Sequence, residues 1–473
     1  MAAGIHPRRG ARVTTYRNGE ISHWAHVTPR PALRTAAALA GDVDLLIVGA
    51  GLTGLWLAYH ALVDDPSTRV LVVEAERVGY GGSGRNGGWL SPLVPGNRAV
   101  YERSRGVDAV RAFQRAMLGA IDDTLAIVAR EGIEAGAVRG GQLRVATGPA
   151  GLARLRAERL AHLRYGLEPD EAVLLGAGET RARIAVEGAL GGLLLPATAR
   201  VQPAALVAGL AAAVEARGGT IVEGVRAESL EPRLVRTSHG PVRTRHAIAC
   251  TEAYSGPLVG ERALIPVRSS MIVTTPIADE DWARIGWEGR ECLGDAAHAF
   301  VYAQRTDDGR IAIGGRGSPY AYDSGLPGDG AMPVSVIRTL HGRLRAMLPG
   351  VRMPVAHAWR GVIGVTRDWC ARVHVDDATG IGHAYGYAGH GVTATNLAAQ
   401  TLLDRIRGRS TPRTALPWND HDSGTWEPEP LRFVGVHAMY RMLGAADAWE
   451  ERTGMPETAL LARVGGRIAG LVE

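Results

Sequence analysis

The chain has 473 residues, enough for two domains with separate cores, and its 46% hydrophobic and 21% charged residues are typical of a soluble globular protein. All 53 basic residues are arginine, but the net charge is only +5 and no basic patch carries interleaved aromatics, which argues against a nucleic-acid partner. The three cysteines lack metal-ligand spacing and no apolar run is long enough to cross a membrane, so we expect a cytoplasmic protein without disulfides, bound metal or membrane contact.

Residues 1–41 form a polar segment that Pro29 and Pro31 interrupt. Its aromatic residues Tyr16, Trp24 and His26 suggest an arm that packs on the body of the protein. A partly disordered terminus is the equally weighted alternative.

Residues 44–74 carry the strongest motif in the chain. An apolar strand at 45–48 is followed by Gly49, Gly51 and Gly54 in G-x-G-x-x-G spacing, and then by a helix and a second strand that ends at Glu74. The glycines allow a tight turn and let a pyrophosphate approach the helix N-terminus, and the carboxylate reaches the adenosine ribose. We therefore predict a dinucleotide site that includes Leu52, Thr53 and Ala75.

A glycine-rich loop, GYGGSGRNGG, follows directly at residues 79–88. A second phosphate-embracing loop suits FAD better than NAD, because FAD continues past its pyrophosphate into a buried ring. A flexible surface loop is the simpler alternative. The cofactor contacts predicted here are Gly82, Ser83, Arg85, Asn86, Gly87 and Gly88.

This block, VGAGLTGL through GYGGSGRNGGWLSP, resembles the D-amino-acid oxidase-like superfamily of FAD amine oxidases, and is most similar to its γ-glutamylputrescine oxidase-like branch. The resemblance implies an α/β protein: a Rossmann-like FAD domain built from discontinuous segments plus a mixed-sheet α+β substrate domain. We expect the FAD domain at 42–135, 201–264 and 356–410, and the substrate domain at 136–200 and 265–355. An N-terminal arm (1–41) and a C-terminal helical extension (411–473) flank them.

The second FAD segment contains a helix at 204–217, a strand at 220–222 and a second strand that runs into Cys250 and Thr251. The resemblance places Ala227 against adenine and Thr251 near the pyrophosphate. An Arg-rich helix at 152–167, in the substrate domain, is most simply solvated. We interpret Cys250 as a core residue.

The second substrate segment opens with a strand at 265–276 and a solvent-side loop at 277–287. The sequence around Asp295 also occurs in flavin monooxygenases, but a strand follows here instead of their glycine loop. The next hairpin resembles the one that borders the substrate face of the flavin. It makes His298, Tyr302 and Arg316 candidates for substrate contact, with ordinary strand residues as the alternative.

The third FAD segment carries a strand that runs into Gly389-His390-Gly391 and then a helix, which aims a second helix N-terminus at the flavin. We predict cofactor contacts at Gly389, His390, Gly391, Val392 and Thr393. The working surface is predicted to include His390, Tyr302, Arg316 and Trp359. No Cys lies at 360–367, where some relatives attach FAD, so we expect non-covalent FAD.

The C-terminal extension contains an amphipathic helix at 431–451 and a shorter helix at 457–471. Packing on the body is the simpler interpretation, and contact within a homodimer is the alternative.

The resemblance implies oxidation of the C–N bond of a small primary or secondary amine or amino acid to an imine, by hydride transfer to the flavin. Reoxidation by O2 would give H2O2. The chain has no lysine, however, so the sequence does not distinguish an oxidase from a dehydrogenase. The other functions considered are a dehydrogenase or monooxygenase acting on a biosynthetic intermediate, and an RNA-modifying flavoprotein.

Overall fold

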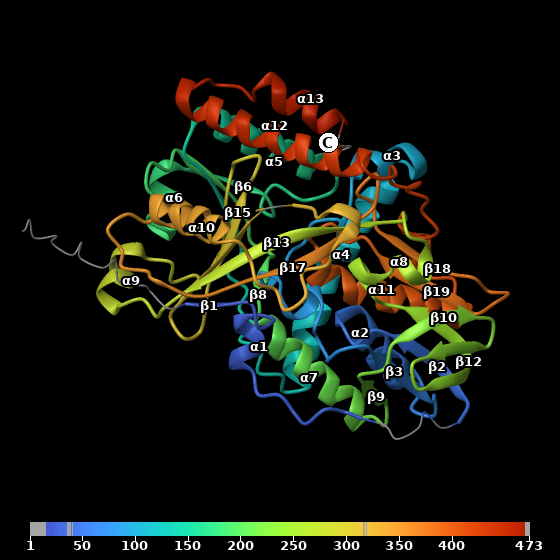
Figure 1. Ribbon diagram of the computed structural model, residues 1–473. Helices are drawn as coiled ribbons and strands as arrows, with labels where there is room; N and C mark the ends of the chain where they lie inside the picture. Colours follow the sequence, from blue (N-terminus) through green and yellow to red (C-terminus); the bar gives the residue numbers. More distant parts are fainter. Residues whose placement is uncertain (1–15, 36–38, 40, 316, 318, 469–473) are drawn as a thin grey trace, which may run out of the picture.

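The computed structural model describes residues 16–35, 39, 41–315, 317 and 319–468, and it contains two large sheets (Figure 1). Five parallel strands form the centre of the first sheet, in the order β9, β3, β2, β12 and β19. An antiparallel meander of β10 and β11 extends the sheet at β12, and β18 pairs with β19. The bounds are β2 (Val43–Val48), β3 (Val70–Glu74), β9 (Thr220–Glu223), β10 (Ala227–Glu231), β11 (Leu234–Thr237), β12 (Gly240–Ala249), β18 (Arg372–Val375) and β19 (Ile381–Tyr385).

Helices cover this sheet and bury the larger hydrophobic core. Helix α2 packs against both α7 and α11, and α4 lies against α11. Their bounds are α2 (Leu52–Asp64), α3 (Arg98–Arg105), α4 (Val107–Arg130), α7 (Pro203–Ala216) and α11 (Gly391–Ile406); the short α8 (Gly256–Val259) follows β12. Helix α2 is apolar nearly all round because it lies between the sheet and these helices.

The second sheet is mixed and has nine strands in the order β1-β17-β13-β16-β15-β14-β5-β7-β6. Its pairings are antiparallel except for β1 with β17 and β14 with β5. The bounds are β1 (Arg17–Asn18), β5 (Gln142–Ala146), β6 (Val173–Gly176), β7 (Gly191–Leu195), β13 (Ile265–Thr274), β14 (Cys292–Asp295), β15 (Val301–Arg305), β16 (Ile311–Gly315) and β17 (Val355–Val365). Helices α5 (Pro149–Arg164), α6 (Ala177–Arg183), α9 (Asp279–Ile285) and α10 (Val334–Met347) accompany it.

The predicted fold class is confirmed: a Rossmann-like parallel sheet and a mixed sheet are built from alternating segments of the chain. Strand β17 lies in the range predicted for the third FAD segment, but it pairs with β13 of the mixed sheet along its whole length. The third segment of the parallel-sheet domain therefore begins near β18 and not at residue 356. The predicted loop at 277–287 contains α9, whose first turn carries three acidic residues at the positive end of the helix dipole.

The described part of the N-terminal arm packs on the body. Strand β1 extends the mixed sheet, and α1 (His23–Val27) follows it. The Trp24 side chain is buried and its indole N–H donates to the Asn86 carbonyl oxygen at 2.9 Å. Close by, β4 (Trp89–Leu90) pairs with β8 (Ala199–Arg200) and joins the glycine-rich loop to the mixed-sheet domain.

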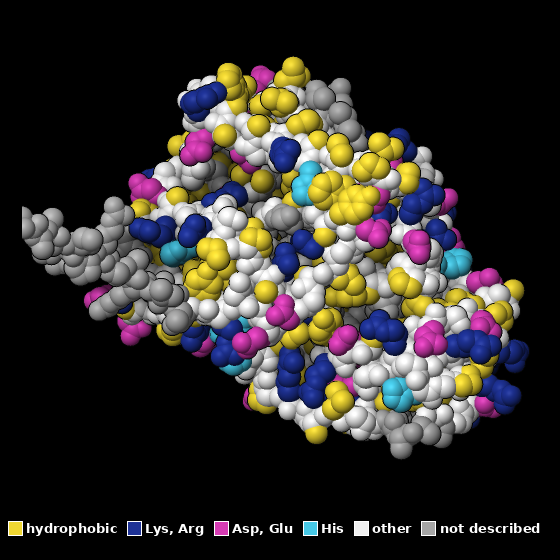
Figure 2. Space-filling model, viewed as in Figure 1, with side chains coloured by type: hydrophobic (Ala, Val, Ile, Leu, Met, Phe, Trp, Pro, Cys, Tyr) yellow, Lys and Arg dark blue, Asp and Glu magenta, His cyan; other side chains and the backbone are white. Residues whose placement is uncertain are grey.

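The C-terminal helices α12 (Leu431–Thr453) and α13 (Leu460–Ile468) pack on each other along one side of the molecule (Figure 1). Figure 2 shows apolar side chains exposed over these helices, at the top of the view. They include Leu431, Val434, Trp449, Leu460 and Leu461. None of the helices that the structure describes is both long enough and apolar enough to cross a membrane.

Candidate active site

The turn from β2 into α2 needs each of its three glycines. Gly49 has a φ of +103°, a region that favours glycine, and a Cβ atom at Gly54 would overlap the Gly49 carbonyl oxygen. Gly51 is the N-cap of α2 and has no side chain to cover the free N–H groups of the first turn. The N-cap residue therefore makes no side-chain bond to this helix N-terminus, whose dipole and N–H groups favour a phosphate.

Glu74 ends β3 beside this turn. Its carboxylate accepts hydrogen bonds from the backbone N–H groups of Ala50 at 2.8 Å and Glu76 at 2.9 Å. Burial raises its pKa. The backbone of Val225, rather than that of the predicted Ala227, meets this strand end, because the Val225 N–H donates to the Glu74 carbonyl oxygen at 2.9 Å.

The glycine-rich loop is shaped by its own polar side chains. Asn86 donates to the carbonyl oxygens of Gly82 at 3.1 Å and Ser83 at 2.8 Å, and its Oδ1 accepts the N–H of Gly88 at 2.7 Å. The Ser83 hydroxyl accepts the N–H of Leu52 at 2.9 Å, which holds the loop against the α2 N-terminus. Two of the predicted contacts, Ser83 and Asn86, therefore shape the cradle around the helix end.

Arg85 is buried within this loop. Its guanidinium donates to the carbonyl oxygens of Tyr80, Gly328 and Arg360 at 2.8 to 3.2 Å and lies 4.5 Å from the centre of the Tyr80 ring. Its Nη2 atom is buried with no hydrogen-bond partner among the described residues. Most of this side chain thus fixes the loop to the mixed-sheet domain.

A second helix N-terminus belongs to α11. Gly389 has a φ of +103°, and the N-cap residue His390 makes no side-chain capping bond. Helix α11 packs closely on α2, and the Thr53 hydroxyl lies 3.2 Å from the hydroxyl of Tyr387. At the end of β12, Thr251 borders the first turn, since a Cβ atom at Gly49 would lie 3.3 Å from its methyl carbon.

The first turn of α11 contains an unexplained buried hydroxyl. The Thr393 side chain is fully buried, and its Oγ1 atom has no hydrogen-bond partner among the described residues. Buried polar atoms are nearly always paired, so this hydroxyl indicates a missing polar group at the helix end. Together with the two helix N-termini and the Glu74 carboxylate, it fits a bound dinucleotide.

A cavity of about 290 Å³ lies between the two domains, next to the second helix N-terminus. The glycine-rich loop, the Ala388–His390 turn, and Ser269 and Tyr302 of the mixed sheet all line it. The hydroxyls of Ser269 and Tyr302 are 2.5 Å apart. The remaining wall is largely apolar and includes Trp89, Leu93, Phe300, Val301, Val362, Ile363 and Val392.

The cavity wall also contains a charged pair that the sequence analysis missed. Arg144 on β5 forms an ion pair with Glu158 on α5, and both side chains line the cavity. Burial alone would raise the pKa of Glu158, but Arg144 and His162 outweigh it and lower the pKa to about 2. Helix α5 is therefore not the merely solvated helix that its arginines suggested, because Glu158 faces inward.

Three residues of the predicted hairpin were expected to contact the substrate. Tyr302 lines the cavity, and its ring is packed against Gly87 and Gly314. His298 bonds to Glu450 on α12 and is not among the residues that line this cavity. Arg316 lies outside the described residues.

Trp359 belongs to the core beneath the glycine-rich loop and does not line the cavity. It is fully buried, packs edge-to-face on Trp24 at 5.8 Å, and donates its indole N–H to the Arg85 carbonyl oxygen at 3.0 Å. In this position Trp359 supports the loop from behind, and its predicted contact with substrate stays a prediction.

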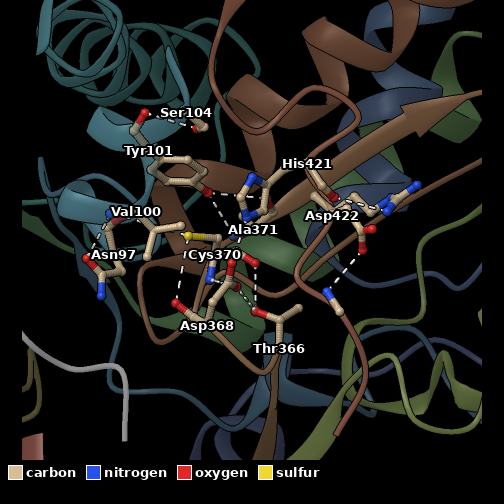
Figure 3. Close-up of polar contacts among 12 residues, drawn as sticks. Asn97, Val100, Tyr101, Ser104, Thr366, Asp368, Cys370, Ala371, His421 and Asp422 are labelled. Carbon is tan, nitrogen blue, oxygen red and sulfur yellow. Dashed lines mark hydrogen bonds and ion pairs between the residues drawn. The ribbon is translucent and has the colours of Figure 1, made fainter. Parts of the chain in front are cut away.

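Cys370 also lies outside the cavity, in a polar cluster that joins β18 to the chain before and after it (Figure 3). Its thiol is buried and donates to the carbonyl oxygens of Asn97 and Asp368 at 3.7 and 3.8 Å. The Asp368 carboxylate accepts the Cys370 N–H at 3.0 Å and bonds to His421 at 2.7 Å. The contacts tie the segment around residue 421 to the body.

The fold and the site together define a protein built to bind a dinucleotide, with a cavity between its two domains. A family model described as FAD dependent oxidoreductase matches residues 44–405, so the chain belongs to this family of FAD-dependent enzymes. The predicted cofactor class and family are thereby confirmed.

Individual relatives agree. The chain is 30% identical over 377 residues to gamma-glutamylputrescine oxidoreductase of Escherichia coli strain K12, covering 77% of this chain and 84% of that protein. Among solved structures, glycine oxidase from Geobacillus kaustophilus is similar, with a TM-score of 0.63 and 18% identity over 79% of this chain and 96% of that one. The FAD-bound L-alpha-glycerophosphate oxidase from Mycoplasma pneumoniae has a TM-score of 0.64 and 15% identity over 82% and 100%.

Proposed function

We propose that the protein oxidises the C–N bond of a small amine or amino acid to an imine in the cavity between its two domains. The observation that carries this proposal is the position of the cavity, which is lined by the glycine-rich loop, the α11 N-terminus and Tyr302 of the mixed sheet. FAD, when bound, supplies the electron acceptor for this oxidation. The residues of the cavity bind the amine, orient it and exclude water.

The apolar wall selects the reactive form of an amine. An ammonium ion is poorly solvated beside Trp89, Phe300 and Val362, so the wall favours loss of the proton from the substrate nitrogen. A neutral amine offers both a lone pair and N–H donors to the Ser269 and Tyr302 hydroxyls. That pair is the polar group we assign to substrate orientation.

The geometry supports a set of proposed cofactor contacts. The N–H groups at the start of α2 would hold the pyrophosphate, Glu74 would accept the ribose hydroxyls, and Thr393 would donate to the polar edge of the flavin ring. We propose that FAD is bound non-covalently. Cys250, Cys292 and Cys370 are all buried free thiols, and none of them lines the cavity.

The relatives support an amine substrate, because gamma-glutamylputrescine oxidoreductase and glycine oxidase are named for amine and amino-acid substrates. We further propose O2 as the acceptor that regenerates FAD, and a cytoplasmic location, which the three free thiols favour. We also propose a homodimer, because α12 and α13 expose apolar side chains that a second copy of the chain could cover.

The test is aerobic turnover with glycine, sarcosine, D-amino acids, putrescine derivatives and aminophosphonates. An oxidase releases peroxide and a carbonyl compound in equal amounts from at least one member of this panel. Turnover that needs an artificial electron acceptor would identify a dehydrogenase instead. A flavoprotein that turns over no amine with either acceptor would contradict the proposal.

A further inference from the structure

Helix α12 lies beyond residue 405, where the family match ends, yet it is bonded to the mixed-sheet domain at one specific loop. The Asp447 carboxylate accepts two consecutive backbone N–H groups, from His298 at 2.8 Å and from Ala299 at 2.9 Å. Each of its oxygens takes one bond. A charged acceptor bonded in this way holds a loop backbone in a single conformation.

Glu450, one turn further along α12, binds the same loop and a second element. Only 6% of its side chain is exposed. Its carboxylate accepts from Arg154 of α5 at 2.6 Å and bonds to the His298 ring at 3.0 Å, while Arg154 also donates to the Ala296 carbonyl oxygen at 2.9 Å. Helix α12 therefore ties the 296–299 loop to α5, the helix that carries the cavity residue Glu158.

The tied loop leads directly into the cavity wall. Phe300, the next residue, lines the cavity and is also 41% exposed, which places it at the cavity mouth. On the other side of the loop, Arg343 of α10 binds the Ala299 carbonyl oxygen and the Asp295 carboxylate. With its backbone bonded from both sides, the loop cannot withdraw Phe300 without breaking charged hydrogen bonds.

We propose that Asp447 and Glu450 are positioning residues that set substrate specificity: they hold Phe300 as a fixed wall at the cavity mouth and so limit the bulk of the amine admitted. This inference rests on the proposed amine-oxidising function. Substrate orientation itself is assigned to the Ser269 and Tyr302 hydroxyls, which bond to each other on the mixed sheet.

The test compares Asp447→Asn and Glu450→Gln with Phe300→Ala, which removes the wall itself. Glu451→Gln is the matched control, because Glu451 is exposed on the same helix. Each holoenzyme is assayed with a series of amines of one chemical type and increasing bulk. We expect the ratio of kcat/KM for the bulkiest to the smallest member to rise about tenfold in Phe300→Ala, a typical effect of pocket size, and to rise in the same direction in Asp447→Asn.

Separate measurement of kcat and KM distinguishes a positioning role from general damage to the fold. Asp447→Asn should lower KM for bulky amines and leave kcat for the smallest amine unchanged, while hydrogen exchange in peptides covering 295–301 increases. Equal loss of kcat for every amine, or unchanged discrimination with unchanged exchange, overturns the proposal. If Asp447→Asn does not fold, Glu450→Gln and Phe300→Ala decide it by the same ratio.

Failure of this proposal is distinct from failure of the proposed function. Wild-type turnover of the amine series is measured first, and its absence contradicts amine oxidation itself. Wild-type turnover combined with a Phe300→Ala variant that keeps the original size preference overturns only the role of α12.

Discussion

Replacing Thr393 with valine should act in opposite directions on the apoprotein and the holoenzyme. The Thr393 hydroxyl is fully buried and has no partner among the described residues. An unsatisfied buried polar group costs about 1–3 kcal/mol, and an apolar group of the same shape removes that cost. Thr393→Val should therefore stabilise the FAD-free protein by about 1–2 kcal/mol.

The same change should weaken FAD binding, because the hydroxyl is placed to bond the cofactor. Loss of one such hydrogen bond, about 1.4 kcal/mol, corresponds to a tenfold rise in Kd. Urea unfolding of the FAD-free protein measures the first effect, and titration with FAD measures the second.

Thr401→Val in the same helix is the matched control. Thr401 is equally buried, but its hydroxyl donates to the Leu397 carbonyl oxygen at 2.8 Å, so it has no bond to offer a cofactor. We expect unchanged FAD affinity in this variant. A Thr393→Val protein with unchanged FAD affinity, or with a less stable apoprotein, would refute the assignment of this hydroxyl to the cofactor.

Three further predictions concern buried polar groups around the site. Burial raises the pKa of Glu252 from 4.5 to about 7. Between these pH values the folded protein keeps a proton that the unfolded chain releases. The free energy of unfolding should therefore fall by about 3 kcal/mol as the pH rises from 4.5 to 7. Glu252→Gln should flatten that slope in thermal unfolding, and an unchanged slope would contradict the assignment. Trp359→Phe leaves the Arg85 carbonyl oxygen without its indole donor, so unfolding should show a loss of about 1–3 kcal/mol, with KM unchanged if the indole only supports the loop. Glu158→Gln leaves Arg144 uncompensated in the cavity, so carboxylate ligands should perturb the flavin spectrum at lower concentration than in wild type; equal affinity would show that this pair does not face the ligand.

The nucleotide-binding parts could be predicted because their physics is local. The glycine spacing, the strand before it and the carboxylate after it lie within one short segment, and each residue does its work through its own backbone or side chain. The order of segments in the two domains also followed from the family resemblance. The place of strand β17 in the mixed sheet did not follow from the sequence, because β17 pairs with β13, about 90 residues away along the chain.

The cavity wall could not be predicted because its members meet only in the folded protein. Arg144 and Glu158 lie on a strand and a helix, and nothing in either local pattern shows that both face one cavity. The position of Trp359 could not be predicted for a related reason. It shares a sheet face with the cavity residue Gly361, but Trp24 from the N-terminal arm covers it.

The most direct test of amine oxidation is an anaerobic titration of the purified protein with the amine panel, followed by the visible absorbance of the flavin. We expect at least one amine to bleach the absorbance in proportion to the enzyme present, and the colour to return with O2. An intact flavin spectrum that no amine bleaches would contradict the proposed reaction, and a protein that binds no flavin would contradict the site itself.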